Sequence, residues 1–268
     1  MKKNIIHIAL CVLIFSFFSC SEYQKLLKST DNELKFNKAI EYFNKRKFIQ
    51  AQTLMSDISS YYKGTERSQE VLYYLSKSYF GQKDYLSAGQ YFQTYLRTFP
   101  RGEHAPEVKF LIGKSYYLDS PDARLDQSTT NQAIDALQAY IEMFPEDDNV
   151  PQAVKMLDEL NDKLAYKQLL NAKLYYNLGN YLGNNYLSAV IVAQNTLKNF
   201  PKTKYREELS LIILQSKFAQ ALNSIDEKRI ERYQDTVDEY YSFINEFPDG
   251  KNRNAAEKIF KEASKNTK

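Results

Sequence analysis

Tryptophan is missing from this chain of 268 residues, and histidine, cysteine and glycine are scarce, with two, two and eight copies. Glycan-binding surfaces usually offer tryptophan rings on which sugars stack, so the missing tryptophan argues against that class of protein. Scarce glycine leaves little material for phosphate-cradling loops. The GxSxG, Walker, HExxH and paired-cysteine motifs are also missing. We therefore expect no catalytic residues, no metal site, no cofactor and no enzymatic activity.

A strong charge of either sign is also missing. The chain has 36 Lys and Arg against 33 Asp and Glu, which gives a formal net charge of +3. Two of the cations, Lys2 and Lys3, lie before residue 20, and the remaining 34 basic and 33 acidic residues give +1. Since nucleic-acid binding depends on a basic surface, we expect no nucleic-acid partner.

The N-terminus has the three parts of a secretory signal. Lys2 and Lys3 form a basic start, residues 5–18 are almost wholly apolar, and the small Ser19 precedes Cys20. This run is too short for a membrane span. A cysteine directly after the cleavage point is typical of bacterial lipoproteins. We expect removal of residues 1–19, lipidation of Cys20 and a linker over 20–31, and the alternative is a plain secretory signal with an incidental cysteine.

Beyond residue 31 the chain repeats itself. Four Phe-Pro pairs occur, and a small residue lies eleven positions before each phenylalanine. The same offset joins Ala51 to Tyr62, where Lys63 replaces proline, so five copies share one frame. Proline ends a helix because it has no amide hydrogen and restricts the residue before it. The phenylalanines are Phe99, Phe144, Phe200 and Phe247, and the small residues are Ala88, Ala133, Ala189 and Thr236.

This spacing is typical of tetratricopeptide repeats. It predicts an all-α superhelical solenoid of about five helix pairs plus a C-terminal capping helix, and the alternative is an ordinary helical bundle. Residues 32–146 would hold repeats one to three, and residues 147–268 would hold repeats four and five and the cap. The expected helices are 33–46, 48–62, 66–81, 84–99, 104–118, 131–144, 152–181, 185–199, 205–223, 229–246 and 252–265.

The first helices of the first three pairs share a pattern of aromatic and basic residues. Helical solenoids present a concave surface that these helices line. The pattern predicts an aromatic-and-lysine groove for a peptide with apolar and anionic features. Alternatively, the rings pack between helices and the lysines are solvated. The predicted groove residues are Phe36, Tyr73, Lys77, Phe80, Phe110, Lys114 and Tyr117.

An insertion separates the two helices of the third pair. Residues 119–126 contain three aspartates and one arginine. They lack the glycine and terminal glutamate of a calcium-binding loop, so we expect a solvated loop.

The order of these features resembles the BamD family, the lipoprotein subunits of the outer-membrane β-barrel assembly machinery. The resemblance rests on the lipoprotein-like start, the stretch YQKLLKS at 23–29 and the five repeats. It extends over residues 20–250. Further similar stretches are KDYLSA at 83–88, SPDARLD at 120–126, KLAY at 163–166 and FPKT at 200–203.

The resemblance implies a non-catalytic scaffold that is lipid-anchored in the outer membrane and faces the periplasm. Its C-terminal repeats would hold the BamA-like barrel protein. Its N-terminal repeats would recognise C-terminal signals of unfolded outer-membrane proteins, with groove aromatics for a terminal ring and lysine for a terminal carboxylate. The alternative function is a general periplasmic tetratricopeptide adaptor lipoprotein that takes no part in barrel assembly.

Overall fold

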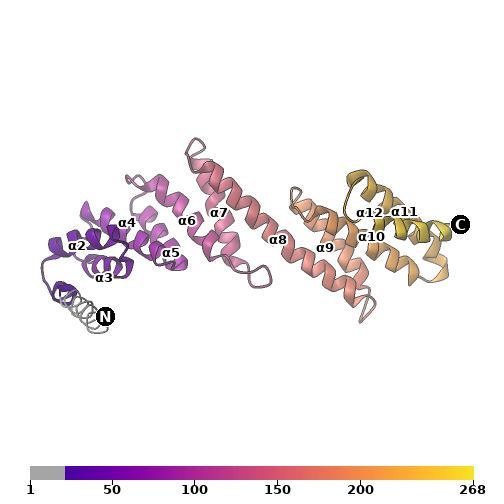
Figure 1. The fold of residues 1–268 in the computed structure, drawn as a ribbon, viewed down its shortest axis with the longest axis horizontal. Coiled ribbons are helices and arrows are strands. Elements are labelled where there is room, and N and C mark those ends of the chain that lie inside the picture. Colours follow the sequence, from indigo (N-terminus) through magenta and orange to yellow (C-terminus); the bar gives the residue numbers. More distant parts are fainter. Residues whose placement is uncertain (1–21) are drawn as a thin grey trace, which may run out of the picture. The chain divides into compact units, whose positions relative to one another are not determined.

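The computed structural model describes residues 22–268, and every regular element in that range is helical (Figure 1). Cys20 and the predicted signal 1–19 lie outside the described residues. Residues 22–27 are helical. The elements that follow are α2 Asn32–Asn44, α3 Phe48–Ile58, α4 Arg67–Gly81, α5 Tyr85–Thr98, α6 Ala105–Asp119, α7 Ser128–Met143, α8 Val150–Leu178, α9 Asn185–Asn199, α10 Arg206–Leu222, α11 Asp226–Glu246, α12 Arg253–Ala263 and the 3-10 helix η1 Ser264–Asn266.

The predicted fold class is confirmed, since each expected helix is present, and the differences lie at helix ends. Helix α3 stops at Ile58, four residues before the predicted end, and turns follow as far as Gly64, whose φ is +82°. Helix α8 stops at Leu178 because Gly179 takes a left-handed φ of +56° and donates its N–H to the carbonyls of Tyr175 and Tyr176. Positive φ suits glycine, which has no Cβ to clash.

The Phe-Pro pairs end their helices as predicted, and they do so with one local geometry. Phe99, Phe200 and Phe247 are C-caps with φ between −126° and −128° and ψ between 64° and 66°. In all four copies the phenylalanine N–H still donates to the carbonyl four residues earlier. The following proline cannot extend this ladder, so the helix ends there.

The predicted small residues lie at the closest approaches between helices. Ala51, Ala88, Ala133, Ala189 and Thr236 are all completely buried. Glycine serves the same purpose on α6, because a Cβ on Gly113 would lie 2.6 Å from Leu137 Cδ2 and 3.2 Å from the Leu137 backbone nitrogen. Small side chains therefore let helix backbones approach at these points, as the repeat frame requires.

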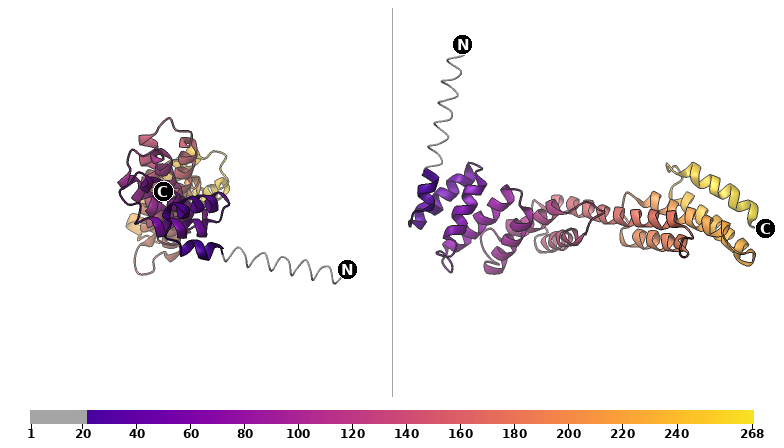
Figure 2. Two further views of the ribbon diagram at one scale, coloured as in Figure 1. Left: turned by 90° about the vertical axis from the view of Figure 1, so that its left-hand side faces the viewer. Right: turned by 90° about the horizontal axis from the view of Figure 1, so that it is seen from below.

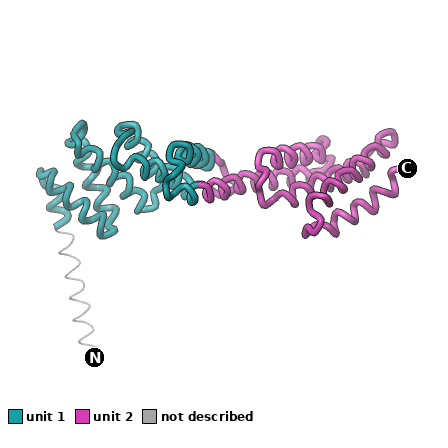
Figure 3. The backbone as a smooth tube through the Cα atoms, turned by 90° about the horizontal axis from the view of Figure 1, so that it is seen from above, with its two compact units in different colours: residues 1–120, 129–153 teal, residues 121–128, 154–268 magenta. Residues whose placement is uncertain are grey.

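The chain forms two compact units (Figure 3). Unit 1 comprises residues 1–120 and 129–153, and unit 2 comprises 121–128 and 154–268. The predicted functional division between 32–146 and 147–268 stays a prediction. In unit 1, the first core is built by α2, α3 and α4 around Phe36, Leu54, Met55 and Ile58.

Unit 2 has its own core between α8, α9 and α10, around Leu169, Val190 and Ile213. The last helix, α12, packs against α10 and α11 through Ala256 and Ala263, which are fully buried. It is the yellow helix at the C-terminal end in Figure 2. It covers the end of the repeat array, so the predicted capping helix is confirmed.

The insertion before α7 is bound to unit 2 and is more ordered than a solvated loop. The buried Gln127 amide donates to the carbonyls of Asp122 and Leu125, at 2.8 and 3.1 Å. Lys167 on α8 donates to the Leu125 carbonyl at 2.6 Å, and Ala123 is buried. Backbone carbonyls of the loop thus find partners within the protein, which sequence alone did not indicate.

Replacing Lys83 with glycine should stabilise the protein. Lys83 has a φ of +64° in the turn between α4 and α5, a conformation that costs an L-residue about 1–2 kcal/mol. Glycine removes this cost but loses about 0.5–1 kcal/mol of chain entropy, so the net gain should be about 0.5 kcal/mol. Urea denaturation measures this gain in the free energy of unfolding. The control is Lys83→Ala, which keeps a Cβ. A midpoint for Lys83→Gly below that of Lys83→Ala would contradict this account.

Candidate functional site

Three of the five aromatic rings that were predicted to line a peptide groove are buried. Phe36, Tyr73 and Phe110 expose only 3%, 6% and 4% of their surface. Phe36 packs edge-on to Tyr62, with ring centroids 6.1 Å apart, and Phe110 packs against Tyr140 at 5.3 Å. These three rings therefore pack inside the repeats, which is the alternative to an exposed groove, and each contacts at least one other aromatic ring.

A cation lies over each of these rings. The Arg67 guanidinium is 4.6 Å from the Phe36 ring centroid, the Lys77 ammonium is 4.9 Å from that of Tyr73, and the Lys114 ammonium is 5.5 Å from that of Phe110. Such contacts between a cation and an aromatic face are favourable. The predicted groove face thus presents cations above an aromatic floor.

Lys77 is also held by a polar network that joins two repeats. Its Nζ lies 2.9 Å from Glu107 Oε1 on α6 and 2.9 Å from the Tyr73 hydroxyl, which donates to Glu107 Oε2 at 2.7 Å. His104 stacks on the Tyr73 ring with centroids 3.8 Å apart. Burial and the Glu107 carboxylate both raise the pKa of Tyr73, which stays neutral and donates. The Lys77 charge is therefore paired within the protein, and its part in peptide binding stays a prediction.

The first repeat has the same arrangement. Glu33 on α2 accepts hydrogen bonds from the Tyr62 hydroxyl at 3.1 Å and from Arg67 Nη1 at 2.7 Å. Within residues 22–268, by contrast, no carboxylate lies within ion-pair distance of Lys114. Phe80 and Tyr117 are half-buried. Outside the network that holds Lys77, the part of the predicted groove that keeps accessible surface is therefore Lys114, Phe80 and Tyr117. No carboxylate of the described residues neutralises the charge of Lys114 there.

Substituting Glu107 with glutamine should make the free energy of unfolding vary less with pH in the acid range. Burial alone would raise the pKa of Glu107, but hydrogen bonds from Lys77 and Tyr73 outweigh it and lower the pKa. A lowered pKa stabilises the fold above the unfolded carboxyl pKa of about 4.3, and the effect is lost as pH falls through the folded pKa. For this half-exposed group we expect less than about 1 kcal/mol.

The measurement is the urea midpoint of wild type and Glu107→Gln between pH 7 and pH 3. The two midpoints should converge as the pH falls. A constant difference across this range would contradict the expected contribution of the Glu107 carboxylate.

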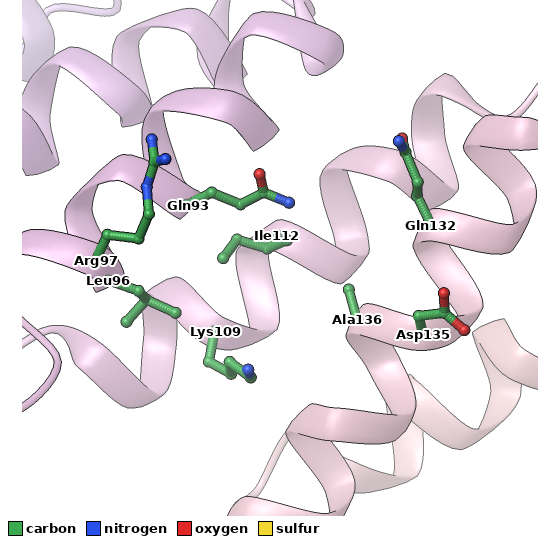
Figure 4. Close-up of a pocket in the computed structure, with 8 residues that line it drawn as sticks. All are labelled: Gln93, Leu96, Arg97, Lys109, Ile112, Gln132, Asp135 and Ala136. Atoms are coloured by element: carbon green, nitrogen blue, oxygen red, sulfur yellow. The ribbon is translucent and has the colours of Figure 1, made fainter.

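A hollow of about 470 Å³ lies elsewhere in unit 1, between α5, α6 and α7 (Figure 4). Ile112 lies in the middle of the view, between side chains from α5 and side chains from α7. Leu96 and Ala136 are the other apolar residues of the lining, and the remaining side chains are polar or charged. The hollow is lined by Gln93, Leu96, Arg97, Lys109, Ile112, Gln132, Asp135 and Ala136.

Sequence reasoning missed this hollow because its residues follow ordinary helical spacing. Each helix contributes residues three or four apart, such as Gln93, Leu96 and Arg97 on α5. This spacing places them on one face, but a solvated face of a surface helix has the same pattern. Only the arrangement of three helices reveals the hollow.

Unit 2 exposes apolar side chains around the connection between α8 and α9. Leu182 is 90% exposed with a left-handed φ of +55°, and its neighbour Tyr181 is 68% exposed. Residues 174–197 contain no Asp, Glu, Lys or Arg, although 26% of the chain is charged. We call this the apolar face of unit 2, formed by Leu174, Leu178, Tyr181, Leu182, Leu187 and Ile191, all of them exposed.

Residues 22–268 lack the features of two other kinds of site. None of the helices there has both the length and the apolar composition that crossing a membrane requires. In the same range, no three His, Cys, Asp or Glu side chains gather into a group that could hold a metal ion.

Paired helices with buried small residues at their crossings and Phe-Pro ends define a repeat protein of the tetratricopeptide type. Within this class, the chain matches the family YfiO, described as "Outer membrane lipoprotein", over residues 28–233. That match covers more than half of the chain and extends into both compact units. The chain therefore belongs to the YfiO family, the family of BamD, and the resemblance found in the sequence is confirmed.

Two relatives are named as outer membrane protein assembly factors BamD. One is a protein assigned this name from Aquifex aeolicus, with 30% identity over 54% of this chain and 46% of the relative. The other, from Caulobacter vibrioides, is 26% identical over 42% of this chain and 37% of the relative. The chain thus matches less than half of the length of either relative. A solved structure, the TPR2AB domain of yeast Sti1 in a complex with pHSP90, aligns with 13% identity and a TM-score of 0.38 over 87% of this chain and 98% of that one.

Proposed function

We propose that this protein is a non-catalytic scaffold of the machinery that assembles outer-membrane β-barrel proteins. The observation that carries the proposal is the YfiO match over residues 28–233, which extends across the repeats of both units. The names of the two BamD relatives support the same role. Its attachment to the outer membrane is through a lipid on Cys20, and the protein faces the periplasm.

Depletion of the protein tests this role. A scaffold of barrel assembly should cause a general loss of outer-membrane barrel proteins, measured by proteomics of the outer-membrane fraction. A general periplasmic adaptor predicts loss of a few partners and no shared barrel defect. An unchanged set of barrel proteins after complete depletion would therefore refute the proposal.

The apolar face of unit 2 is where we place the BamA-like barrel protein. Exposed apolar side chains from a stretch without charged residues are typical of the centre of a protein–protein interface. Leu182 has no internal packing that accounts for a bulky residue at positive φ, so a partner that buries it would supply the missing contact.

A single tryptophan can report this contact, because the chain has none of its own. In Leu182→Trp, the emission should shift to the blue when the periplasmic domains of the co-purifying barrel protein are added. Leu222→Trp is the matched control, since Leu222 is also exposed but lies at the end of α10. Equal responses of the two probes, or none, would remove this face from the proposal.

We place the C-terminal signals of unfolded outer-membrane proteins on the face of unit 1 that the first helices of the repeats form, at Lys114, Phe80 and Tyr117. Among residues 22–268 no carboxylate lies within ion-pair distance of Lys114, which leaves its charge available to a terminal carboxylate. Lys114→Glu should weaken binding of peptides with a free C-terminus by about tenfold, measured by titration. Amidated peptides are the control, and their affinity should not change. Equal effects on both peptides would contradict the assignment.

A further inference from the structure

The side chains around the hollow between α5, α6 and α7 suit a peptide that carries both a negative charge and an apolar group. We propose that it binds an extended segment of another protein in which an acidic residue lies beside an aliphatic one. The proposal concerns a surface apart from the predicted groove, and it does not depend on the role in barrel assembly.

The cationic side of the hollow points to an acidic ligand. Arg97 from α5 and Lys109 from α6 both line it. Across residues 22–268, neither has a carboxylate within ion-pair distance, and Arg97 donates only to the Thr94 hydroxyl, at 3.1 Å. Two cations without a carboxylate partner beside one hollow are complementary to a carboxylate, which Arg can bind through two parallel hydrogen bonds.

The apolar, amide and acidic residues of the lining indicate which further groups the ligand should carry. Leu96 and Ala136 are half-buried, and beside the buried Ile112 they offer apolar surface for an aliphatic side chain. Gln93 from α5 and Gln132 from α7 lie on either side of Ile112 (Figure 4). Each amide can both donate to and accept from a peptide backbone. Asp135 on α7 disfavours a second acidic group there, so the ligand should be singly acidic and enter in one orientation.

The test uses three blocked peptides and the mature chain, residues 20–268, with methyl-labelled isoleucine and leucine. The peptides are Ac-ALDLA-NH2, its neutral form Ac-ALNLA-NH2 and its basic form Ac-ALKLA-NH2. The acidic peptide should shift the methyl signals of Ile112 and Leu96 and bind at least about tenfold more tightly than the neutral one, as expected for one charge-assisted contact.

Charge reversal distinguishes this site from general attraction to a basic surface. The double variant Arg97→Glu and Lys109→Glu should lose the acidic peptide and prefer the basic one. The matched control is Arg101→Glu with Lys155→Glu, two exposed cations that do not line the hollow, and it should bind as wild type does. Circular dichroism establishes that both variants are folded, and Lys109→Gln is the milder replacement if the double variant is not.

Three results would overturn the proposal. The first is the absence of shifts at Ile112 and Leu96, and the second is equal affinity for the acidic and neutral peptides. The third is an identical shift produced by acetate alone at the same concentration, which would reduce the site to one for small anions. Since the depletion experiment does not involve this hollow, failure here leaves the proposed function unaffected.

Discussion

Truncation of Tyr95 to alanine should lower the free energy of unfolding by about 3–5 kcal/mol, the range for removing a large buried aromatic ring. Tyr95 on α5 is completely buried in unit 1. Its ring packs against Tyr73 and Phe99, with centroids 6.3 and 5.7 Å apart, and its hydroxyl accepts the His104 N–H at 3.3 Å. One substitution would therefore leave a cavity and an unsatisfied amide at the junction of the second and third repeats.

Tyr95→Phe separates the two contributions, because it keeps the ring and removes only the hydroxyl. This control should cost about 0.5–1.5 kcal/mol. Urea denaturation followed by circular dichroism measures both variants, and hydrogen exchange of unit 1 amides locates the loss. If alanine cost no more than phenylalanine, the ring would not be the packing element that its burial indicates.

Replacement of Cys20 by serine should release the protein from the membrane almost completely. Lipid chains contribute about 0.8 kcal/mol per buried CH2, so losing the diacylglyceryl group that we propose for Cys20 would change membrane partitioning by many orders of magnitude. Fractionation of cells, followed by immunoblotting of the soluble periplasmic and outer-membrane fractions, measures this shift.

The control for this release is Ser21→Ala, which keeps the cysteine and should remain in the membrane fraction. A partner in the membrane could hold the serine variant there, so the fractions are also washed with high salt and the experiment is repeated in cells depleted of the barrel partner. A serine variant that stays in the membrane fraction under both conditions would show that Cys20 is not the tether.

The helix pairs and their ends were predictable because their causes are local. A proline after phenylalanine ends a helix whatever its surroundings, so Phe99 and Phe247 could be placed from sequence. The end of α8 was missed because Gly179 was not recognised as a left-handed cap. The surrounding stretch reads as a continuous helix unless that conformation is expected.

The site was less predictable because it depends on neighbours that are distant in sequence. Tyr73 has the same place in its repeat as Phe36 and Phe110, and the sequence pattern predicted a groove there, but all three rings are buried. The ring and hydroxyl of Tyr73 are held by His104 and Glu107, which come from the following repeat. The spacing on one helix does not tell which neighbour covers it. The hollow around Ile112 is harder still, because it needs three helices at once and has no residue type that marks it.

The insertion at residues 119–126, which Lys167 binds, affects how the two compact units can be expressed as separate fragments. Because residues 121–128 belong to unit 2 while 129–153 return to unit 1, the backbone passes from one unit to the other at three places. No single stop or start codon yields either half intact: a product ending at 120 lacks α7, and one beginning at 154 lacks the segment that Lys167 holds. Separate halves would need a rearranged gene in which residues 121–128 are grafted onto the second fragment and a new linker joins residues 120 and 129.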